Sequence, residues 1–217
     1  RAAVGCPMTV SYDGLDVSWL GYATARVETP DGTVIYTDPG RYGVLDGTWA
    51  EQYGGTDHPS GDAYDARDGD VVLVTHDHHY SGETVDRVAS EDATVVVYEE
   101  VDADRITEGG RSVESPESLR DDVRRVAYDE TLTVHGVEVT AVPAYNHPDG
   151  PRADADGTVS HPEGFGCGFH FVADETPCLW TGDSDVVPEQ EALDVSLLFP
   201  SIAQSFTMDR HEAADLA

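Results

Sequence analysis

The sequence contains no lysine: all twelve of its basic residues are arginines. Without lysine there is no Schiff-base chemistry and no phosphate-binding loop that depends on a lysine amine. No run approaches the roughly 20 apolar residues of a membrane-spanning helix, and no signal-peptide pattern opens the chain. No serine nucleophile elbow, Walker A loop or dinucleotide fingerprint follows a predicted strand. The sequence therefore excludes the reaction classes that depend on these local motifs.

Acidic residues greatly outnumber basic ones, with 43 Asp and Glu against 12 Arg and a net charge of −31. Such a charge repels itself strongly in dilute salt, whereas molar salt shortens the Debye length to about 3 Å and screens the repulsion. The acidic residues are spread over the whole chain rather than gathered in a tail. This pattern predicts a protein adapted to extreme salt; the alternative is an acidic interaction protein such as a nucleic-acid mimic.

Cysteine is scarce, and its three positions, Cys6, Cys167 and Cys178, have no metal-ligand spacing and cannot all pair. This usage is typical of a reducing compartment, so we predict a cytoplasmic protein. The chain begins with Arg1 rather than Met, and residues 208–217 resemble a helix that stops in mid-course. We therefore expect further residues beyond both ends.

Strand-like runs fall into two groups along the chain. The predicted strands lie at residues 15–20, 23–29, 33–37, 71–75 and 94–98, and then at 126–127, 131–134, 137–142, 165–172, 178–181 and 195–199. Helices are predicted at residues 83–89 and 115–125, and long loops at 40–70 and 143–164. Two groups of strands with a few helices predict two sheets packed face to face, with helices outside, in one domain over residues 1–217.

Three histidines, His76, His78 and His79, follow the apolar strand predicted at residues 71–75. Imidazole is the commonest metal ligand, and side chains at positions i and i+2 of an extended backbone project to the same side. At a strand end such a pair could bind Zn²⁺ at about 2.0–2.1 Å. The alternative is an incidental pair of histidines.

Two further segments carry potential ligands. Asp183 follows an apolar strand and Gly182, which permits a sharp turn and presents a carboxylate at the sheet edge. Its alternative is an ordinary turn. His147 and His161 each precede a proline and so lie on restricted, extended backbone. Their alternative is a pair of surface loop histidines.

The order of these parts resembles the metallo-β-lactamase superfamily, and most closely its branch of ascorbate phosphate lactonases. The resemblance runs from about residue 15 to the end. The segments that carry it are Gly21-Tyr22-Ala23-Thr24, Asp38-Pro39, Thr75-His76-x-His78, Ala144-Tyr145-Asn146 with His161-Pro162, and Gly182-Asp183-Ser184. It implies a four-layer αββα sandwich with one or two metal ions, Zn²⁺ or Mn²⁺, bound by loops at one edge.

Members of this superfamily carry the motif H-x-H-x-D-H. His76 and His78 match its first two histidines, which are ligands of the first metal, whereas the acid and last histidine of the second site fall on Tyr80 and Ser81. Asp183 matches the carboxylate that usually touches both metals. The resemblance therefore implies a degenerate second site.

The remaining ligands implied by the resemblance are less regular. Asn146 stands in the ordinary place of a histidine ligand, so His161 or His147 would substitute for it. Asp38 matches a buried acid that orients ligands. A last histidine is expected beyond Ala217.

These residues predict a hydrolase of a small ester, lactone or phosphoester that uses metal-activated water. Asp183 would serve catalysis as well as metal binding, Tyr80 could hydrogen-bond an oxyanion, and His79 could repair the second site or shuttle a proton. The alternative is a non-catalytic binding or assembly protein. The expected partner is a small-molecule substrate, with no membrane; a homo-oligomer stays open, and Arg124-Arg125, the only adjacent basic pair, gives no basic stripe for nucleic acid.

Overall fold

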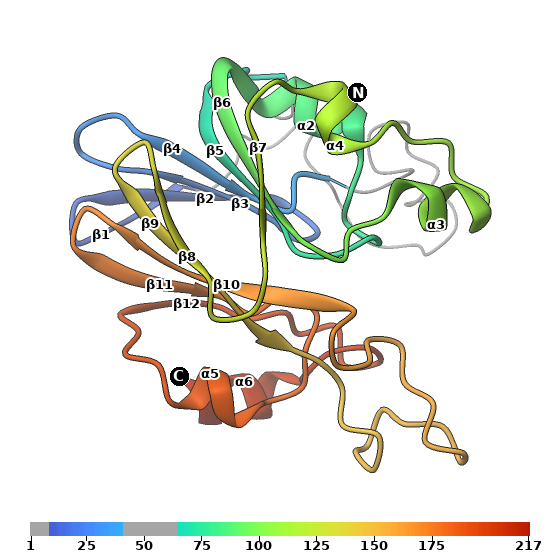
Figure 1. The fold of residues 1–217 in the computed structure, drawn as a ribbon. Helices are drawn as coiled ribbons and strands as arrows, with labels where there is room; N and C mark the ends of the chain where they lie inside the picture. Colours follow the sequence, from blue (N-terminus) through green and yellow to red (C-terminus); the bar gives the residue numbers. More distant parts are fainter. Residues whose placement is uncertain (1–8, 41–64) are drawn as a thin grey trace, which may run out of the picture. The chain divides into compact units, whose positions relative to one another are not determined.

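The computed structural model describes residues 9–40 and 65–217 and divides into two compact units. Among the described residues, the N-terminal unit covers 9–40, 65–97 and 102–124, and the C-terminal unit covers 98–101 and 125–217. Each unit is built mainly on one β sheet (Figure 1). Most of the loop predicted at residues 40–70 lies outside the described residues, as does Cys6. The prediction of one domain over the whole chain stays a prediction.

The sheet of the N-terminal unit contains seven strands in sequence order. They are β1 (Thr9–Tyr12), β2 (Leu15–Gly21), β3 (Thr24–Glu28), β4 (Val34–Thr37), β5 (Gly69–Val74), β6 (Ala89–Tyr98) and β7 (Val123–Val126). Strands β1 to β4 pair antiparallel, whereas β5 pairs parallel with both β4 and β6. Residues 71–74 of β5 are apolar and fully buried, as expected for a strand between parallel neighbours. The sequence predicted β2 to β5 within two residues and missed the exposed edge strand β1.

The helix predicted over residues 115–125 is wrong for most of its length. Only α4 (Pro116–Leu119) is helical there, and β7 takes the end of the segment. Backbone N–H groups of Val95 and Glu99 donate to the carbonyls of Asp122 and Val126, at 3.0 and 2.9 Å. Pairing with β6 therefore outweighs the helix preference of the intervening residues, because tertiary contacts override propensity.

The other helices of the N-terminal unit are α2 (Gly82–Val88), which was predicted, and α3 (Ala103–Glu108), which was not. Helix α2 begins directly after the histidine-rich segment and buries Thr84, Val85 and Val88. The carboxylate of Asp102 caps α3 by accepting from the first free backbone N–H groups of the helix.

The sheet of the C-terminal unit has the order β12-β11-β10-β9-β8 and is antiparallel except for the β11–β12 pair. Its strands are β8 (Thr131–Val134), β9 (Val137–Ala144), β10 (Gly166–Ala173), β11 (Thr176–Trp180) and β12 (Leu197–Phe199). A turn at His135 and Gly136 joins β8 to β9, with φ of +48° and +80°. Positive φ at both residues suits a tight hairpin.

Two helices complete this unit, α5 (Pro188–Glu191), which packs against β9, and α6 (Arg210–Leu216). Helix α6 confirms the helical prediction near the end of the chain. Its capping box joins the Asp209 carboxylate to the backbone N–H of Glu212, and the Glu212 carboxylate to the backbone N–H of Asp209.

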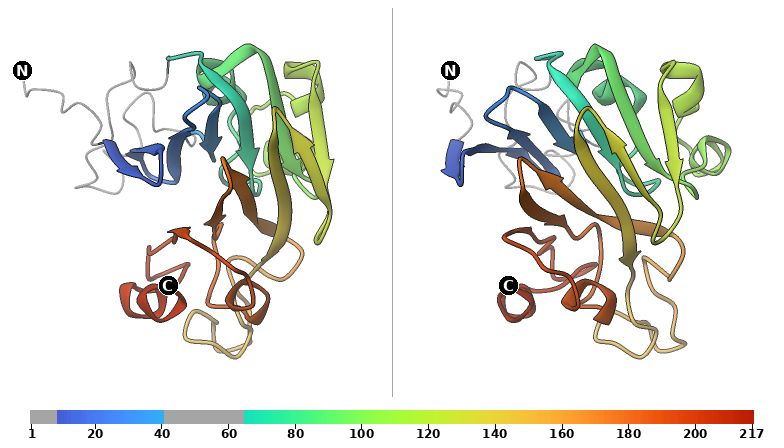
Figure 2. Two further views of the ribbon diagram at one scale, coloured as in Figure 1. Left: turned by 90° about the vertical axis from the view of Figure 1, so that its left-hand side faces the viewer. Right: turned by 60° about the vertical axis from the view of Figure 1, so that its left-hand side comes forward.

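A long loop, residues 145–165, joins β9 to β10 and extends away from the strands of its sheet (Figure 2). It contains two of the predicted ligands, His147 and His161. A loop of this length without regular structure is typically functional.

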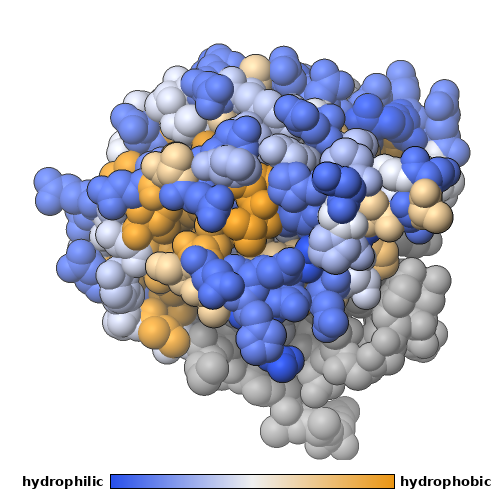
Figure 3. All heavy atoms as spheres, turned by 90° about the horizontal axis from the view of Figure 1, so that it is seen from below, coloured by the Kyte–Doolittle hydropathy of each residue, from blue (hydrophilic) through white to orange (hydrophobic). Residues whose placement is uncertain are grey.

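The face drawn in Figure 3 is covered mostly by hydrophilic residues. Large hydrophobic side chains in the described ranges are exposed at Val10, Tyr12, Trp19, Ile202 and Phe206. None of the helices in residues 9–40 and 65–217 combines the length and the apolar character that crossing a membrane requires.

Candidate metal centre

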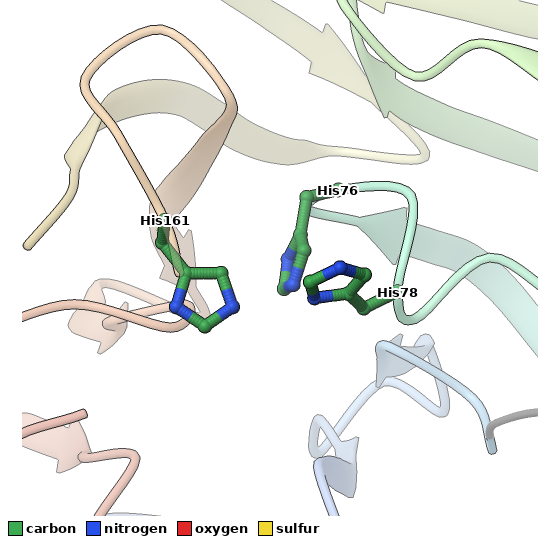
Figure 4. A group of neighbouring side chains, drawn as sticks. All are labelled: His76, His78 and His161. Carbon is green, nitrogen blue, oxygen red and sulfur yellow. The ribbon is translucent and has the colours of Figure 1, made fainter. Parts of the chain in front are cut away.

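The three clustered histidines lie on a tight turn that follows β5. The backbone N–H of His79 donates to the carbonyl of His76, and that of Tyr80 donates to Asp77, at 3.1 and 3.3 Å. The extended backbone expected for His76 and His78 is therefore wrong. The turn instead places the His76 ring centroid 5.1 Å from that of His78 and 4.4 Å from that of His79. Figure 4 draws His76 and His78 on this turn.

A buried carboxylate, Asp38, organises the start of the turn. Its Oδ1 accepts the backbone N–H of Thr75 at 2.8 Å, and its Oδ2 accepts the Thr75 hydroxyl at 2.8 Å. The same Oδ2 lies 2.9 Å from Nδ1 of His79. Asp38 follows β4 with φ of +35° and is fully buried. The predicted orienting acid thus contacts the histidine segment directly.

The Thr75 hydroxyl fixes the proton of His76. The hydroxyl has a single hydrogen, which it donates to Asp38. Its oxygen lies 2.9 Å from Nδ1 of His76 and therefore accepts the hydrogen on Nδ1. A neutral His76 then carries its lone pair on Nε2. Ligand histidines are held in this way, with one ring N–H bonded to an outer partner.

Two arginines hold the same turn, and sequence reasoning missed both. Arg105 donates to Oδ2 of Asp77 at 2.5 Å, while Oδ1 of Asp77 accepts the backbone N–H of Asp102 at 2.9 Å. Arg111 donates to the carbonyls of Asp77 and His78. These contacts fix the backbone on which His76 and His78 stand.

In the C-terminal unit, Asp183 leaves the end of β11 through a turn that only glycine permits. Gly182 has φ of +63°, and a Cβ there would lie 2.2 Å from the carbonyl oxygen of Cys167. The Ser201 hydroxyl donates to Oδ1 of Asp183 at 3.0 Å. One carboxylate oxygen is thereby oriented, and the other, Oδ2, lies 3.4 Å from Nε2 of His161.

His161 stands on the loop before β10 (Figure 4) and is buried. Its Nδ1 lies 3.3 Å from the backbone carbonyl of Phe206 and 3.3 Å from Oδ1 of Asn146. A backbone carbonyl can only accept, so Nδ1 of His161 is the protonated nitrogen. A neutral His161 thus turns the lone pair of Nε2 toward Asp183.

This pair of atoms fits a shared cation. An unprotonated Nε2 and a carboxylate oxygen repel each other unless a proton or a metal ion lies between them. Two ligands at 2.0–2.1 Å from a tetrahedral ion are about 3.3 Å apart, and the observed separation is 3.4 Å. Imidazole and carboxylate are also the donors that zinc, manganese and iron accept.

Two predicted site residues make other contacts. Nε2 of His147 donates to the carbonyl of Val186 at 3.0 Å, since that oxygen can only accept, so the geometry favours His161 over His147 as a ligand. The fully buried Tyr80 gives its hydroxyl proton to the carbonyl of Glu114 at 2.8 Å. That contact is a correction to the predicted oxyanion role, because the phenol has a single proton to donate.

A family model described as a β-lactamase superfamily domain matches residues 16–217. The chain belongs to the metallo-β-lactamase superfamily. The predicted fold class, an αββα sandwich, is confirmed by this membership together with two mixed sheets accompanied by helices. The narrower resemblance to ascorbate phosphate lactonases stays a prediction.

Several solved structures share the fold at low identity. A protein from Parabacteroides distasonis proposed to be a metal-dependent hydrolase is 21% identical, with 98% of this chain and 83% of that chain covered and a TM-score of 0.66. CmlA, a diiron β-hydroxylase from Streptomyces venezuelae, is 20% identical over 88% of this chain and 35% of its own, with a TM-score of 0.54. A metallo-β-lactamase variant from Cronobacter sakazakii is 13% identical, with 100% and 93% covered and a TM-score of 0.51. No curated protein shows a significant match.

Proposed function

We propose that the chain is a metal-dependent hydrolase of a small ester, lactone or phosphoester. The superfamily match supports His76, His78 and His161 as ligands of one ion, with Asp183 as a further ligand. His79 would contribute to a second ion. Membership of a superfamily of metal-dependent hydrolases supports this assignment.

The contact between His161 and Asp183 carries the proposal. The Nδ1 proton of His161 is committed to carbonyl oxygens, and Oδ2 of Asp183 lies 3.4 Å from the opposite ring nitrogen. At His76 the hydrogen bond from Nδ1 to the Thr75 hydroxyl orients the ring in the same way. In both histidines the contacts of Nδ1 orient the ring, and Nε2 is the nitrogen that would bind a cation.

A divalent cation bound there would lower the pKa of a water molecule and polarise a carbonyl or phosphoryl oxygen of the substrate. The protein's own groups then orient and move protons. Asp38 faces Nδ1 of His79 at 2.9 Å, an arrangement that leaves Nε2 of His79 as a base that can accept a proton. Ser201 holds the Asp183 carboxylate in one orientation.

We propose one main ion rather than two. Tyr80 and Ser81 stand where the superfamily motif has an acid and a histidine, and the Tyr80 hydroxyl is bonded to Glu114. A second site would rely on His79 alone for the missing ligands. We propose Zn²⁺ or Mn²⁺ as the ion, and iron is the further candidate because CmlA is described as a diiron protein.

We also propose a small-molecule substrate rather than nucleic acid, because Arg124-Arg125 is the only adjacent basic pair in the sequence and gives no basic stripe. Cys167 and Cys178 are buried and form no disulfide, and burial raises the pKa of the Cys178 thiol to about 12. Reduced, buried cysteines support the proposal of a reducing, cytoplasmic location.

Metal content and turnover together test this function. Protein purified in high salt without chelator should hold about one equivalent of metal and hydrolyse a chromogenic ester or phosphodiester. We expect His76→Ala to lose the ion and Asp183→Asn to lose turnover by more than the roughly 10–100-fold that an outer-shell contact costs. His211→Ala, at an exposed position on α6, is the matched control and should retain both.

Two results separate the alternatives. Protein that remains metal-free after incubation with Zn²⁺, Mn²⁺ and Fe²⁺ overturns the proposal. Stoichiometric metal without turnover of any ester or phosphodiester supports the non-catalytic binding or assembly protein instead.

A further inference from the structure

We propose that Asn146 is a positioning residue that fixes the proton and the direction of His161, and that Arg152 ties this device to helix α6. The inference rests on the proposed role of His161 as a metal ligand. It deepens the proposed function because Asn146 stands where the superfamily resemblance places a histidine ligand. The residue at this position would then act through the ligand rather than as one.

The side chain of Asn146 is buried and fully engaged. Its Oδ1 accepts the backbone N–H of His161 at 3.1 Å and faces the ring Nδ1 of His161 at 3.3 Å. Its Nδ2 donates to Oδ1 of Asp185 at 3.1 Å and to the carbonyl of Phe206 at 3.0 Å. Because both partners of Nδ2 can only accept, the amide has one orientation, with its oxygen toward His161.

The backbone of Asn146 strengthens the same contact, since its N–H donates to the carbonyl of His161 at 2.7 Å. Residues 146 and 161 are therefore joined by bonds in both directions across a long loop. The His161 ring cannot rotate without breaking its bond to the Asn146 amide. These bonds hold the two ends of the β9–β10 loop together beside His161, the proposed metal ligand.

Asp185 holds the amide in turn. Its Oδ2 accepts the backbone N–H of His147 at 2.9 Å, and its own backbone N–H donates to the carbonyl of Tyr145 at 2.9 Å. Its Oδ1, the acceptor for Asn146, also lies 2.9 Å from a guanidinium nitrogen of Arg152. These donors hold the buried carboxylate of Asp185 in one orientation.

Arg152 connects the hydrogen-bonded group of Asp185, Asn146 and His161 to helix α6. Its side chain is only 6% exposed and bonds Glu212 as well as Asp185 and the backbone carbonyl of Thr207. Burial would lower the pKa of Arg152, but the Glu212 and Asp185 carboxylates raise it. The hydrogen bond from Arg152 holds the pKa of Glu212 below its usual value. A continuous chain of polar contacts thus runs from α6 through Arg152, Asp185 and Asn146 to His161.

The tautomer of His161 in metal-free protein tests this inference directly. Long-range ¹H–¹⁵N spectra in high salt at about pH 8, well above the ordinary histidine pKa of about 6.5, report which ring nitrogen carries the proton. The His161 signals are assigned by their loss in His161→Ala. We expect a hydrogen-bonded Nδ1–H in the unmodified protein, whatever the state of Nε2 beside Asp183, and a shifted Nδ1 signal in Asn146→Ala, where of these two acceptors only the Phe206 carbonyl remains.

Metal affinity gives the second measurement, by titration with Zn²⁺ and Co²⁺. We expect Asn146→Ala to weaken binding about 10–100-fold, the usual effect of losing an outer-shell contact. Asn146→Asp keeps the acceptor for Nδ1 of His161 and should retain the Nδ1–H tautomer. His211→Ala again serves as the unchanged control.

The outcomes distinguish this inference from the proposed function. If the unmodified protein binds no metal, the function fails, while the tautomer measurement still decides the role of Asn146. A His161 without a proton on Nδ1 in the unmodified protein overturns the inference, even if Asn146→Ala does not fold. An unchanged Nδ1 signal together with unchanged metal affinity in a folded Asn146→Ala would also overturn it.

Discussion

Ring nitrogen Nδ1 carries the proton in both His76 and His161, although the two residues belong to different units of the fold. The acceptors differ: a threonine hydroxyl whose own hydrogen is committed to Asp38, and a backbone carbonyl. In both cases Nε2 is left with the lone pair. Outer partners of this kind raise the basicity of a ligand as well as orienting it.

At the residue scale, Asp38→Asn should weaken metal binding about 10–100-fold and lower stability by about 1–3 kcal/mol. The carboxylate accepts two bonds from Thr75 and faces His79, whereas an amide NH₂ group would leave one buried donor unmatched. Metal titration and chemical denaturation in high salt measure the two effects.

Asp174→Asn is the matched control for this substitution. Asp174 is exposed and has φ of +47°, close to the +35° of Asp38, so both variants place asparagine on left-handed backbone. We expect Asp174→Asn to leave affinity and stability unchanged. Equal effects of the two variants would contradict the role assigned to Asp38.

The sequence predicted the candidate ligands better than the contacts that hold them. His76, His78 and Asp183 follow apolar strands, a pattern visible in the chain itself. Arg111 and Arg152 escaped prediction because nothing in their local sequence marks them. Each acts on residues more than thirty positions away, His78 and Asp185 respectively, and only the fold brings such groups together.

At the scale of elements, we expect Gly182, in the turn that follows β11, to tolerate no larger residue. In Gly182→Ala the new Cβ would meet the Cys167 carbonyl at 2.2 Å, so β10 or the turn must shift. We expect a loss of more than about 2 kcal/mol, from left-handed strain of about 1–2 kcal/mol and overpacking of about 1–3 kcal/mol. Asp183 would move with the turn, so bound metal should be lost as well.

Gly136→Ala is the control that separates the cost of positive-φ backbone strain from the cost of a steric clash at Cβ. Gly136 also has positive φ, +80°, but nothing lies within 4 Å of its ideal Cβ. Denaturation curves should show the strain alone, about 1–2 kcal/mol, with metal binding intact. A Gly182→Ala protein as stable as Gly136→Ala would show that the close approach to Cys167 does not matter.

Strand prediction succeeded where the residues are continuously apolar, as in β5, and where turns have positive-φ residues, as between β8 and β9. It failed for β1 and β7, which lie at opposite edges of their sheet and expose many of their side chains. An edge strand receives its order from one neighbour only. Its own sequence therefore needs no hydrophobic period, and the charged residues of β7 suggested a helix instead.

At the scale of the whole molecule, the net charge of −31 predicts dependence on salt. Repulsion acts over about 10 Å at 0.1 M salt and about 3 Å at 1 M. We expect Tm to fall steadily as KCl is reduced from molar concentration, with unfolding at low ionic strength. Differential scanning calorimetry across a KCl series measures this.

An uncharged osmolyte controls for general effects of the solvent. Sucrose favours compact states by exclusion from the surface but does not screen charge. It should therefore recover only part of the stability lost on removing KCl. A Tm independent of salt would contradict adaptation to extreme salt and favour the acidic interaction protein.

The arginines that hold the two ligand-bearing segments have a consequence for their sensitivity to acid and base. Arg105, Arg111 and Arg152 bond carbonyls or carboxylates around the histidine turn and the β9–β10 loop. A guanidinium does not lose its proton in proteins, so alkali leaves these anchors intact. Acid instead weakens the contact between Arg152 and Glu212, because the lowered pKa of Glu212 makes its stabilisation complete above the ordinary value of 4.5 and lost as pH falls through the lowered pKa. With arginine rather than lysine in this contact, only the acidic side of the pH scale breaks it.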